Sequence, residues 1–234
     1  MPEPGDKTEL MRSLRGLVRG LAVLFWALPA TLLICFLIAL ENDLGEVLER
    51  LGVIPPLVGN ALLFYGLWQV AIFQRDERPW QRVLDRCKLL ALINTGLAPF
   101  LFWWHRMPGE MVFQISVAVL AVSGAMFLFN LNFALHQLAA MLPDQTLRGE
   151  ARLFTRLNLG MMAAVLVLMT AFFALLQFAD GPHAPVFLVI VRDAIADGRR
   201  FLLVFMVLLP LALTMSLIWK TKETILNGIF HETA

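Results

Sequence analysis

Charged residues are scarce in this chain of 234 residues. Asp, Glu, Lys and Arg make up 16% of the sequence, against about 25% in soluble domains. Residues of the hydrophobic set make up 59%, and the mean hydropathy is +0.73. A chain this short has a large surface for its volume, so a core cannot take up the surplus apolar side chains. The surplus must face lipid, which makes the bilayer the first expected partner. With a net charge of +1 and no basic stripe, nothing points to nucleic acid.

Six hydrophobic runs contain no Asp, Glu, Lys or Arg at all. They cover residues 21–40, 54–73, 89–105, 115–141, 159–178 and 201–219. A helix needs about 20 largely apolar residues to span a bilayer, and these runs meet or approach that length. The sequence therefore predicts an all-α integral membrane protein with six transmembrane helices in one polytopic domain over residues 1–234. The missing charges argue against a proton-coupled pump and a voltage sensor, which carry ionisable residues within their spans.

Basic residues are unevenly distributed among the segments that flank these runs. The N-terminal segment, the loops 74–88 and 142–158 and the C-terminal tail hold 14 of the 19 Lys and Arg residues. Basic residues near span ends concentrate on the cytoplasmic side. Both termini are therefore expected in the cytoplasm, in a multi-pass protein of a cell membrane, which in a bacterium is the inner membrane. Cys35 and Cys87 are not expected to pair, because Cys87 then lies on the reducing side.

Catalytic and cofactor motifs are missing as well. The two cysteines have no CxxC or metal-ligand spacing, and no HExxH-like ligand set of an intramembrane metalloprotease is present. His105 is expected at the outer end of the third span and His136 near the inner end of the fourth, so they cannot hold a haem at a common depth. Ser123-Gly124 ends like a nucleophile motif, but Ala121 replaces its first glycine and no later span offers a histidine base. We therefore expect no cofactor, no metal and no catalytic residue, and an enzyme is the least favoured class.

Neutral polar side chains remain inside the runs. The candidates for a polar lining or for contacts between helices are Asn60, Gln69, Asn94, Asn130, Asn132, His136 and Gln137. Within the fourth run, Asn130 and Gln137 share one helix face, and Asn132 and His136 share another. Such residues either line a path for a solute or join helices by hydrogen bonds worth about 0.6–2 kcal/mol each. Amides commonly join membrane helices, which favours the second interpretation.

Short amphipathic segments precede the first, third and fifth runs. In residues 80–87, apolar side chains recur at helical spacing opposite two arginines, which predicts a helix lying at the membrane surface. Tryptophan is also common at binding hot spots. The candidate docking residues for a protein partner on the cytoplasmic face are Trp80, Val83, Arg82 and Arg86. The alternative is a helix that only anchors at the level of the lipid headgroups.

The chain also suggests an internal triplication. At a spacing of 70 residues, Arg12, Arg82 and Arg152 align, each in a basic lead-in to an odd-numbered run. The chain can then be read as three helical hairpins in one orientation. The alternative is that basic-flanked membrane hairpins resemble one another without repetition, and identity across the odd-numbered runs is close to chance for this composition.

Small residues four positions apart are a weaker signal. Gly16 and Gly20 form a GxxxG motif, and Gly160 and Ala164 form GxxxA. Both permit close approach of two helices. Motifs this short are frequent by chance, so they add little by themselves.

Two classes of function fit these observations. The first is a non-enzymatic, membrane-embedded component of a larger membrane assembly, either a scaffold or an accessory subunit. The second is a transporter or channel component for a neutral or apolar solute, which fits the polar residues within the runs. It also fits the apolar stretch 184–191, which is too short to span the bilayer but could enter and leave it on the same side. A water-filled cavity lined by Asn130, Asn132 and Gln137 would favour transport. A packed bundle with an apolar groove on its outside would favour assembly.

Overall fold

All regular structure in the described part of the chain is helical. The computed structural model describes residues 4–39, 51–74, 77–107, 109–141, 149, 152–161, 163–164, 167 and 208–226. Its four long helices are α1 (Pro4–Ala39), α3 (Ile54–Val70), α4 (Arg78–Arg106) and α5 (Met111–Met141). Two further helical segments cover residues 152–161 and 208–226. The predicted all-α class is confirmed.

Three helical stretches are long and apolar enough to cross a membrane. They are Arg12–Ile38, Arg78–Arg106 and Met111–Met141. α3 has 17 residues, and a helix of that length is about 25 Å long, near the lower limit for a bilayer. The chain is therefore a helical membrane protein, while six spans, cytoplasmic termini and the triplication stay predictions. The predicted re-entrant stretch 184–191 and most of the fifth run lie outside the described residues.

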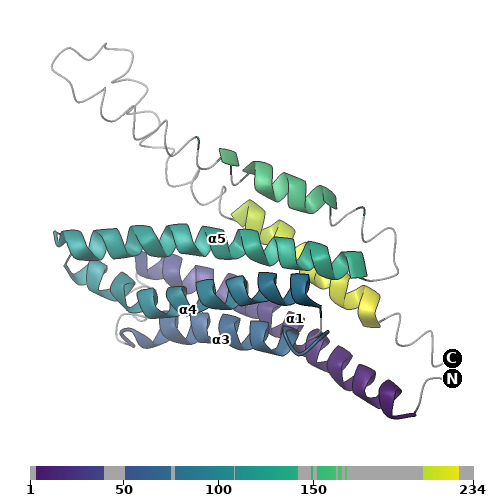
Figure 1. Cartoon of the computed structure of the whole chain (residues 1–234). Helices are drawn as coiled ribbons and strands as arrows, with labels where there is room; N and C mark the ends of the chain where they lie inside the picture. Colours follow the sequence, from purple (N-terminus) through teal and green to yellow (C-terminus); the bar gives the residue numbers. More distant parts are fainter. Residues whose placement is uncertain are drawn as a thin grey trace.

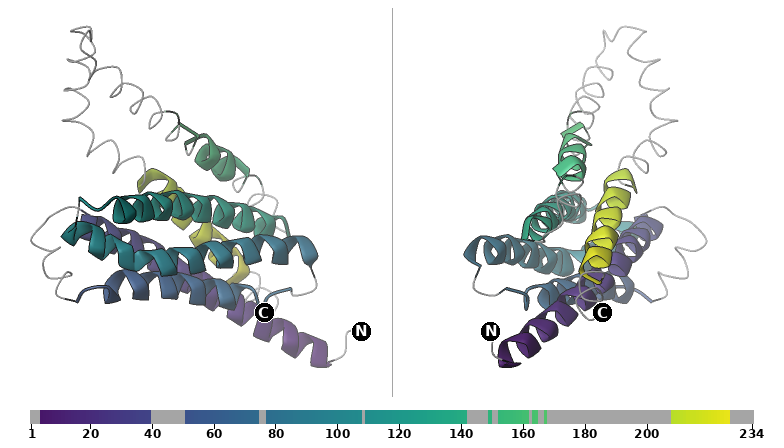
Figure 2. Two further views of the ribbon diagram at one scale, coloured as in Figure 1. Left: turned by 60° about the vertical axis from the view of Figure 1, so that its left-hand side comes forward. Right: turned by 90° about the vertical axis from the view of Figure 1, so that its right-hand side faces the viewer.

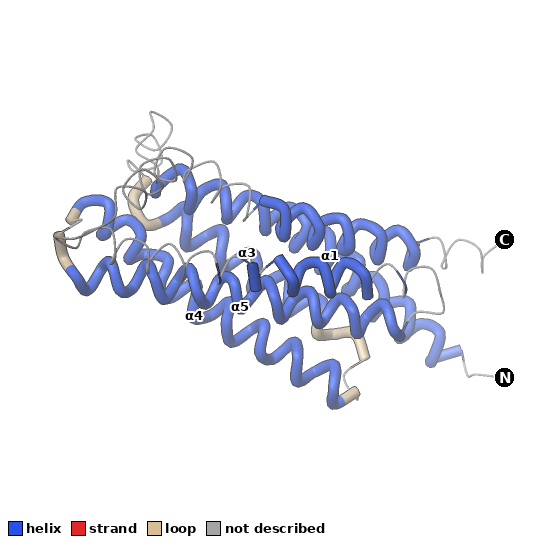
Figure 3. Tube along the Cα trace, turned by 90° about the horizontal axis from the view of Figure 1, so that it is seen from above, coloured by secondary structure: helices blue, strands red, loops and turns tan. Residues whose placement is uncertain are grey.

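Consecutive helices pack against one another in an up-and-down order. α1 packs on α3, α3 on α4 and α4 on α5, and residues 208–226 cross the bundle beside α1 and α5 (Figures 1 and 2). The rings of Phe25 and Trp219 join α1 to this last helix, with centroids 5.6 Å apart. Seen from above, the described helices run along roughly one direction (Figure 3). The start of α1, the end of α5 and the end of helix 208–226 lie at the same end of the bundle (Figure 1).

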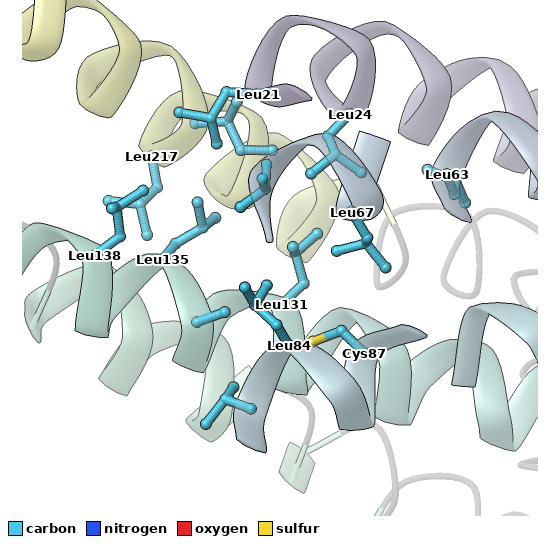
Figure 4. Close-up of a cluster of buried hydrophobic side chains, with 14 of the residues drawn as sticks. Leu21, Leu24, Leu63, Leu67, Leu84, Cys87, Leu131, Leu135, Leu138 and Leu217 are labelled. Atoms are coloured by element: carbon cyan, nitrogen blue, oxygen red, sulfur yellow. The ribbon is translucent and has the colours of Figure 1, made fainter. Parts of the chain in front are cut away.

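Leucine side chains from all these helices fill the interior. The labelled side chains of the cluster in Figure 4 are Leu21, Leu24, Leu63, Leu67, Leu84, Cys87, Leu131, Leu135, Leu138 and Leu217. Within a membrane, such contacts stabilise by close packing, since lipid tails are as apolar as leucine. Both cysteines are free thiols, as predicted. The packed interior fixes the rotation of each helix and thereby the positions of its polar groups.

A glycine brings α1 and α3 into close contact. A Cβ atom added at Gly20 would lie 2.8 Å from both the Gly66 carbonyl oxygen and the Val70 nitrogen, closer than real Cβ contacts. At Gly16, one turn earlier, the nearest atom would be 3.8 Å away. Gly20 therefore permits close helix approach, as the GxxxG motif predicts. A Cβ at Gly160 would meet nothing within 4 Å in the described part, so GxxxA makes no such contact there.

Residues 80–87, predicted as an amphipathic helix at the membrane surface, are helical, and their apolar face packs inside the bundle. These residues belong to one continuous helix, α4, which begins at Arg78. Trp80 is 1% exposed, and its indole N–H donates a hydrogen bond to the Phe73 carbonyl at 3.2 Å. With 29 residues, α4 is longer than a bilayer requires, so its first turns extend the bundle and their apolar stripe packs inward. The buried stripe consists of Trp80, Val83, Leu84 and Cys87.

Candidate functional site

Three of the seven predicted polar side chains have hydrogen bonds only within their own helix, among the described residues. Asn60 is buried in α3, and its amide donates to the Pro56 carbonyl one turn back at 2.8 Å. Gln69 donates to the Tyr65 hydroxyl at 2.8 Å. Asn130 donates to a backbone carbonyl of α5, also at 2.8 Å. These bonds occupy amide hydrogens locally, which is how a membrane helix satisfies an amide that has no partner on a neighbouring helix.

Asn94 joins α4 to α5. Its side chain is buried, and its carbonyl oxygen accepts a hydrogen bond from the Ser123 hydroxyl. A hydrogen bond between side chains of two membrane helices holds them at a defined rotation. The Ser123 hydroxyl thus takes part in the contact between the two helices. The structural interpretation of Asn94 fits this geometry better than a solute lining does.

Asn132, Asn158 and Thr214 form a buried group that we call the polar cluster. The Asn132 amide donates to Thr214 Oγ1 at 2.8 Å, and the Asn158 amide donates to the same atom at 3.3 Å. The Thr214 hydroxyl in turn donates to a backbone carbonyl of its own helix at 2.8 Å. Its one hydrogen and both lone pairs are therefore used. The polar cluster links α5 to the two helical segments 152–161 and 208–226, which are distant in the sequence.

Several buried acceptor atoms on this side of the bundle have no hydrogen-bond partner in the part of the chain that the structure describes. They are Asn132 Oδ1, Asn158 Oδ1, Gln137 Oε1 and Thr155 Oγ1. Buried polar atoms are normally paired with protein groups or with ordered water. Each of these oxygens therefore marks a position where a buried water or a hydrogen-bonding group of a ligand would be stabilised.

His136 lies apart from the polar cluster, in the wall of a surface pocket. The pocket has a volume of about 310 Å³ and is lined by Phe133, His136, Arg152, Thr155 and Arg156. Asn132 and His136 are one turn apart, yet Asn132 bonds into the interior and His136 faces the pocket. Among the described residues, no group of three or more His, Cys, Asp or Glu side chains could hold a metal ion.

The four predicted docking residues are divided between interior and surface. Trp80 and Val83 are buried, whereas Arg82 and Arg86 are exposed. Asp85, which lies between the two arginines, pairs with Lys88 at 3.1 Å. A partner can therefore reach the two guanidinium groups without any change in the bundle, but it cannot reach the apolar stripe. Docking of a partner at these residues stays a prediction, and in the described bundle the two arginines are its accessible part.

Sequence reasoning missed two members of the polar cluster. Asn158 lies just before the fifth run, and Thr214 lies inside the sixth run. A threonine in a span so often bonds to its own backbone that its presence carries little signal. In the sequence, the two pocket arginines indicate only the topology and, for Arg152, a possible repeat. The available signal was the spacing of Arg152, Thr155 and Arg156, which places all three side chains on one helix face.

Known proteins give no further guide to this site. No family model matches the chain, and no curated protein or solved structure matches it either. The function is therefore argued from the helix contacts, the polar cluster and the pocket.

Proposed function

We propose that this chain is a non-enzymatic, membrane-embedded component of a larger membrane assembly, acting as a scaffold or accessory subunit. The observation that carries the proposal is the use of its interior polar side chains. Asn94 bonds to Ser123 across α4 and α5, and Asn132 bonds to Thr214 across α5 and helix 208–226. In a solute path such groups would face an aqueous cavity, whereas here they tie helix to helix. A bundle held in this way offers a fixed surface to other subunits.

The outer face of α5 is the surface that we assign to a partner's transmembrane helix. In the most hydrophobic stretch of α5, 11% of the residues are buried by the described part of the chain, against 33% in α1 and 28% in α4. A glycine costs a helix about 1 kcal/mol relative to alanine. At Gly20 the close contact between α1 and α3 explains why glycine is present despite this cost. At Gly124 no such contact explains it, because a Cβ there would meet no described atom within 4 Å. Gly124 instead leaves room for a helix from outside. The small residues near it on α5 are Ala118, Ala121 and Ala125, all exposed.

The proposed location is a cell membrane, in a bacterium the inner membrane, which the chain crosses several times with both termini in the cytoplasm. The excess of Lys and Arg in alternate segments supports this orientation. Arg82 and Arg86 then face the cytoplasm, where their exposed guanidinium groups can bind acidic groups of a protein partner. The cytoplasmic contact thus stays in the proposal, but it moves from the apolar stripe to the two arginines.

A transporter or channel component for a neutral or apolar solute is the second candidate. The unpartnered oxygens of Asn132 and Asn158 favour it, because they could accept hydrogen bonds from such a solute. A path to them would admit water in at least one state. In a variant with Cys35→Ser and Cys87→Ala, a new cysteine at Asn158 would then react with a small, membrane-impermeant thiol reagent. A packed bundle predicts no reaction in intact membranes.

Copurification from native membranes tests the assembly proposal. Gly124→Leu would fill the space left on α5, and Gly96→Leu on α4 is its matched control, since neither Cβ would meet a described atom within 4 Å. Both variants should fold and insert at wild-type levels. Gly124→Leu should lose a partner protein that copurifies with the wild type and with Gly96→Leu in mild detergent. An identical set of copurifying proteins for all three would contradict the assignment to α5.

A further inference from the structure

The pocket beside His136 carries positive charge that the assembly proposal does not use. Arg152 and Arg156 are one turn apart on helix 152–161, which brings their side chains to the same face, about 6 Å apart along the axis. Both are exposed, and no carboxylate lines the pocket in the described part of the chain. Guanidinium groups form forked hydrogen bonds with phosphates and carboxylates. The pocket is therefore suited to an anion.

Thr155 adds an unused hydroxyl to the same pocket. Its Oγ1 is buried and has no hydrogen-bond partner among the described residues, although it lies between the two arginines in the sequence. A buried polar atom without a partner is destabilising, so a ligand that bonds to it gains affinity. A tetrahedral phosphate presents oxygens in several directions and can reach two guanidinium groups and a hydroxyl together. A planar carboxylate presents two oxygens in one plane and fits this arrangement less well.

Apolar side chains continue from the pocket along both helices. On α5, Met126, Phe129 and Phe133 follow one another at helical spacing, and all three are exposed. On helix 152–161, Leu159 extends the line of Arg152 and Arg156 and is also exposed. A free phosphate would gain nothing from these side chains. An acyl chain would lie against them, as it does where basic pockets between membrane helices bind anionic lipid headgroups.

We propose that this pocket binds the phosphate group of an anionic phospholipid. Arg152 and Arg156 hold the phosphate oxygens, Thr155 bonds to one of them, and His136 forms the opposite wall. Phe133 lies below the phosphate, against the glycerol and the first part of the acyl chain. The pocket is near the end of α5 that lies with the start of α1 (Figure 1), so the lipid belongs to the leaflet on the side predicted to be cytoplasmic.

Lipid titration of the full chain in a neutral detergent tests this proposal. Phosphatidylglycerol should raise the unfolding temperature and stay bound in native mass spectrometry, whereas phosphatidylcholine should do neither. Arg152→Gln with Arg156→Gln should weaken phosphatidylglycerol binding by roughly tenfold or more. Thr155→Val, which keeps both charges, should weaken it by a few-fold. The matched control is Arg82→Gln with Arg86→Gln, another exposed pair one turn apart, and it should keep wild-type affinity.

Three other outcomes of these binding experiments would overturn the proposal. Equal stabilisation by inorganic phosphate at the same concentration would overturn the assignment to a lipid, because the apolar side chains would then contribute nothing. Equal weakening by the two arginine double variants would overturn the site, since the effect would reflect net charge alone. Unchanged binding in the Arg152 and Arg156 double variant, at unchanged stability, would overturn it as well.

Discussion

Replacing Gly20 by alanine should weaken the contact between α1 and α3. The added Cβ would lie 2.7 Å from the Val70 side chain and 2.8 Å from two backbone atoms of α3, whereas ordinary contact begins at 3.4 Å. Because backbone atoms cannot rotate away, the helices must separate by about 0.6 Å at this point. A gap of about 0.5–1 Å removes a quarter to a half of the dispersion energy of the atoms that line it. Overpacking of this kind costs about 1–3 kcal/mol.

Gly16→Ala is the matched control for this substitution. Gly16 lies one turn earlier on α1, and a Cβ there would be 3.8 Å from the nearest atom. Both substitutions gain helix propensity of about 1 kcal/mol, so the difference between them reports the helix contact alone. Gly20→Ala should be less stable than Gly16→Ala by about 1–3 kcal/mol, measured by steric trapping or thermal unfolding in mild detergent. Equal stability of the two variants would refute the close approach of α1 and α3.

Three further tests of the interior use the same measurement. Trp80→Ala should lower the free energy of unfolding by about 3–5 kcal/mol, because the indole is 1% exposed. The control Trp26→Ala changes a side chain that is 72% exposed and should lower the free energy of unfolding much less. Equal losses of stability would contradict the burial of the stripe. A double-mutant cycle of Asn94→Leu and Ser123→Ala should give a coupling of about 0.6–2 kcal/mol, and zero coupling would speak against the bond between α4 and α5. Thr214→Val should cost about 1–3 kcal/mol, since two amides lose their acceptor, while Thr214→Ser should restore most of it. Wild-type stability of Thr214→Val would be incompatible with the polar cluster.

The helical class and the place of the hydrophobic runs could be predicted from the sequence, because both depend on local composition. To within one residue, α1 contains the run 21–40, α4 the run 89–105 and α5 the run 115–141. The run 54–73 continues three residues beyond Val70, where α3 ends. A stretch of that length without charge has few stable places other than lipid. Apolar length alone therefore carries this part of the fold.

The packing partners of the amphipathic segments that precede the first, third and fifth runs could not be predicted in the same way. Periodicity shows that Trp80 and Val83 share a face, but not whether that face meets lipid, a partner or another helix of the chain. The answer depends on α4 running without a break from Arg78, which brings the stripe against α1, α3 and α5. Likewise, nothing local to Asn158 or Thr214 indicates that they meet. Long-range pairing of this kind follows from the packing of the whole bundle.

Photocrosslinking from the outer face of α5 tests the assembly proposal most directly. Ala121 is exposed on this helix, one turn before Gly124 and on the same side, so a benzoylphenylalanine at this position would project outward without disturbing the interior. Irradiation of native membranes should give an adduct with one second polypeptide of defined mass, and Gly124→Leu in the same chain should abolish it. Adducts with lipid alone, or only with another copy of this chain, would contradict a role as a component of a larger assembly.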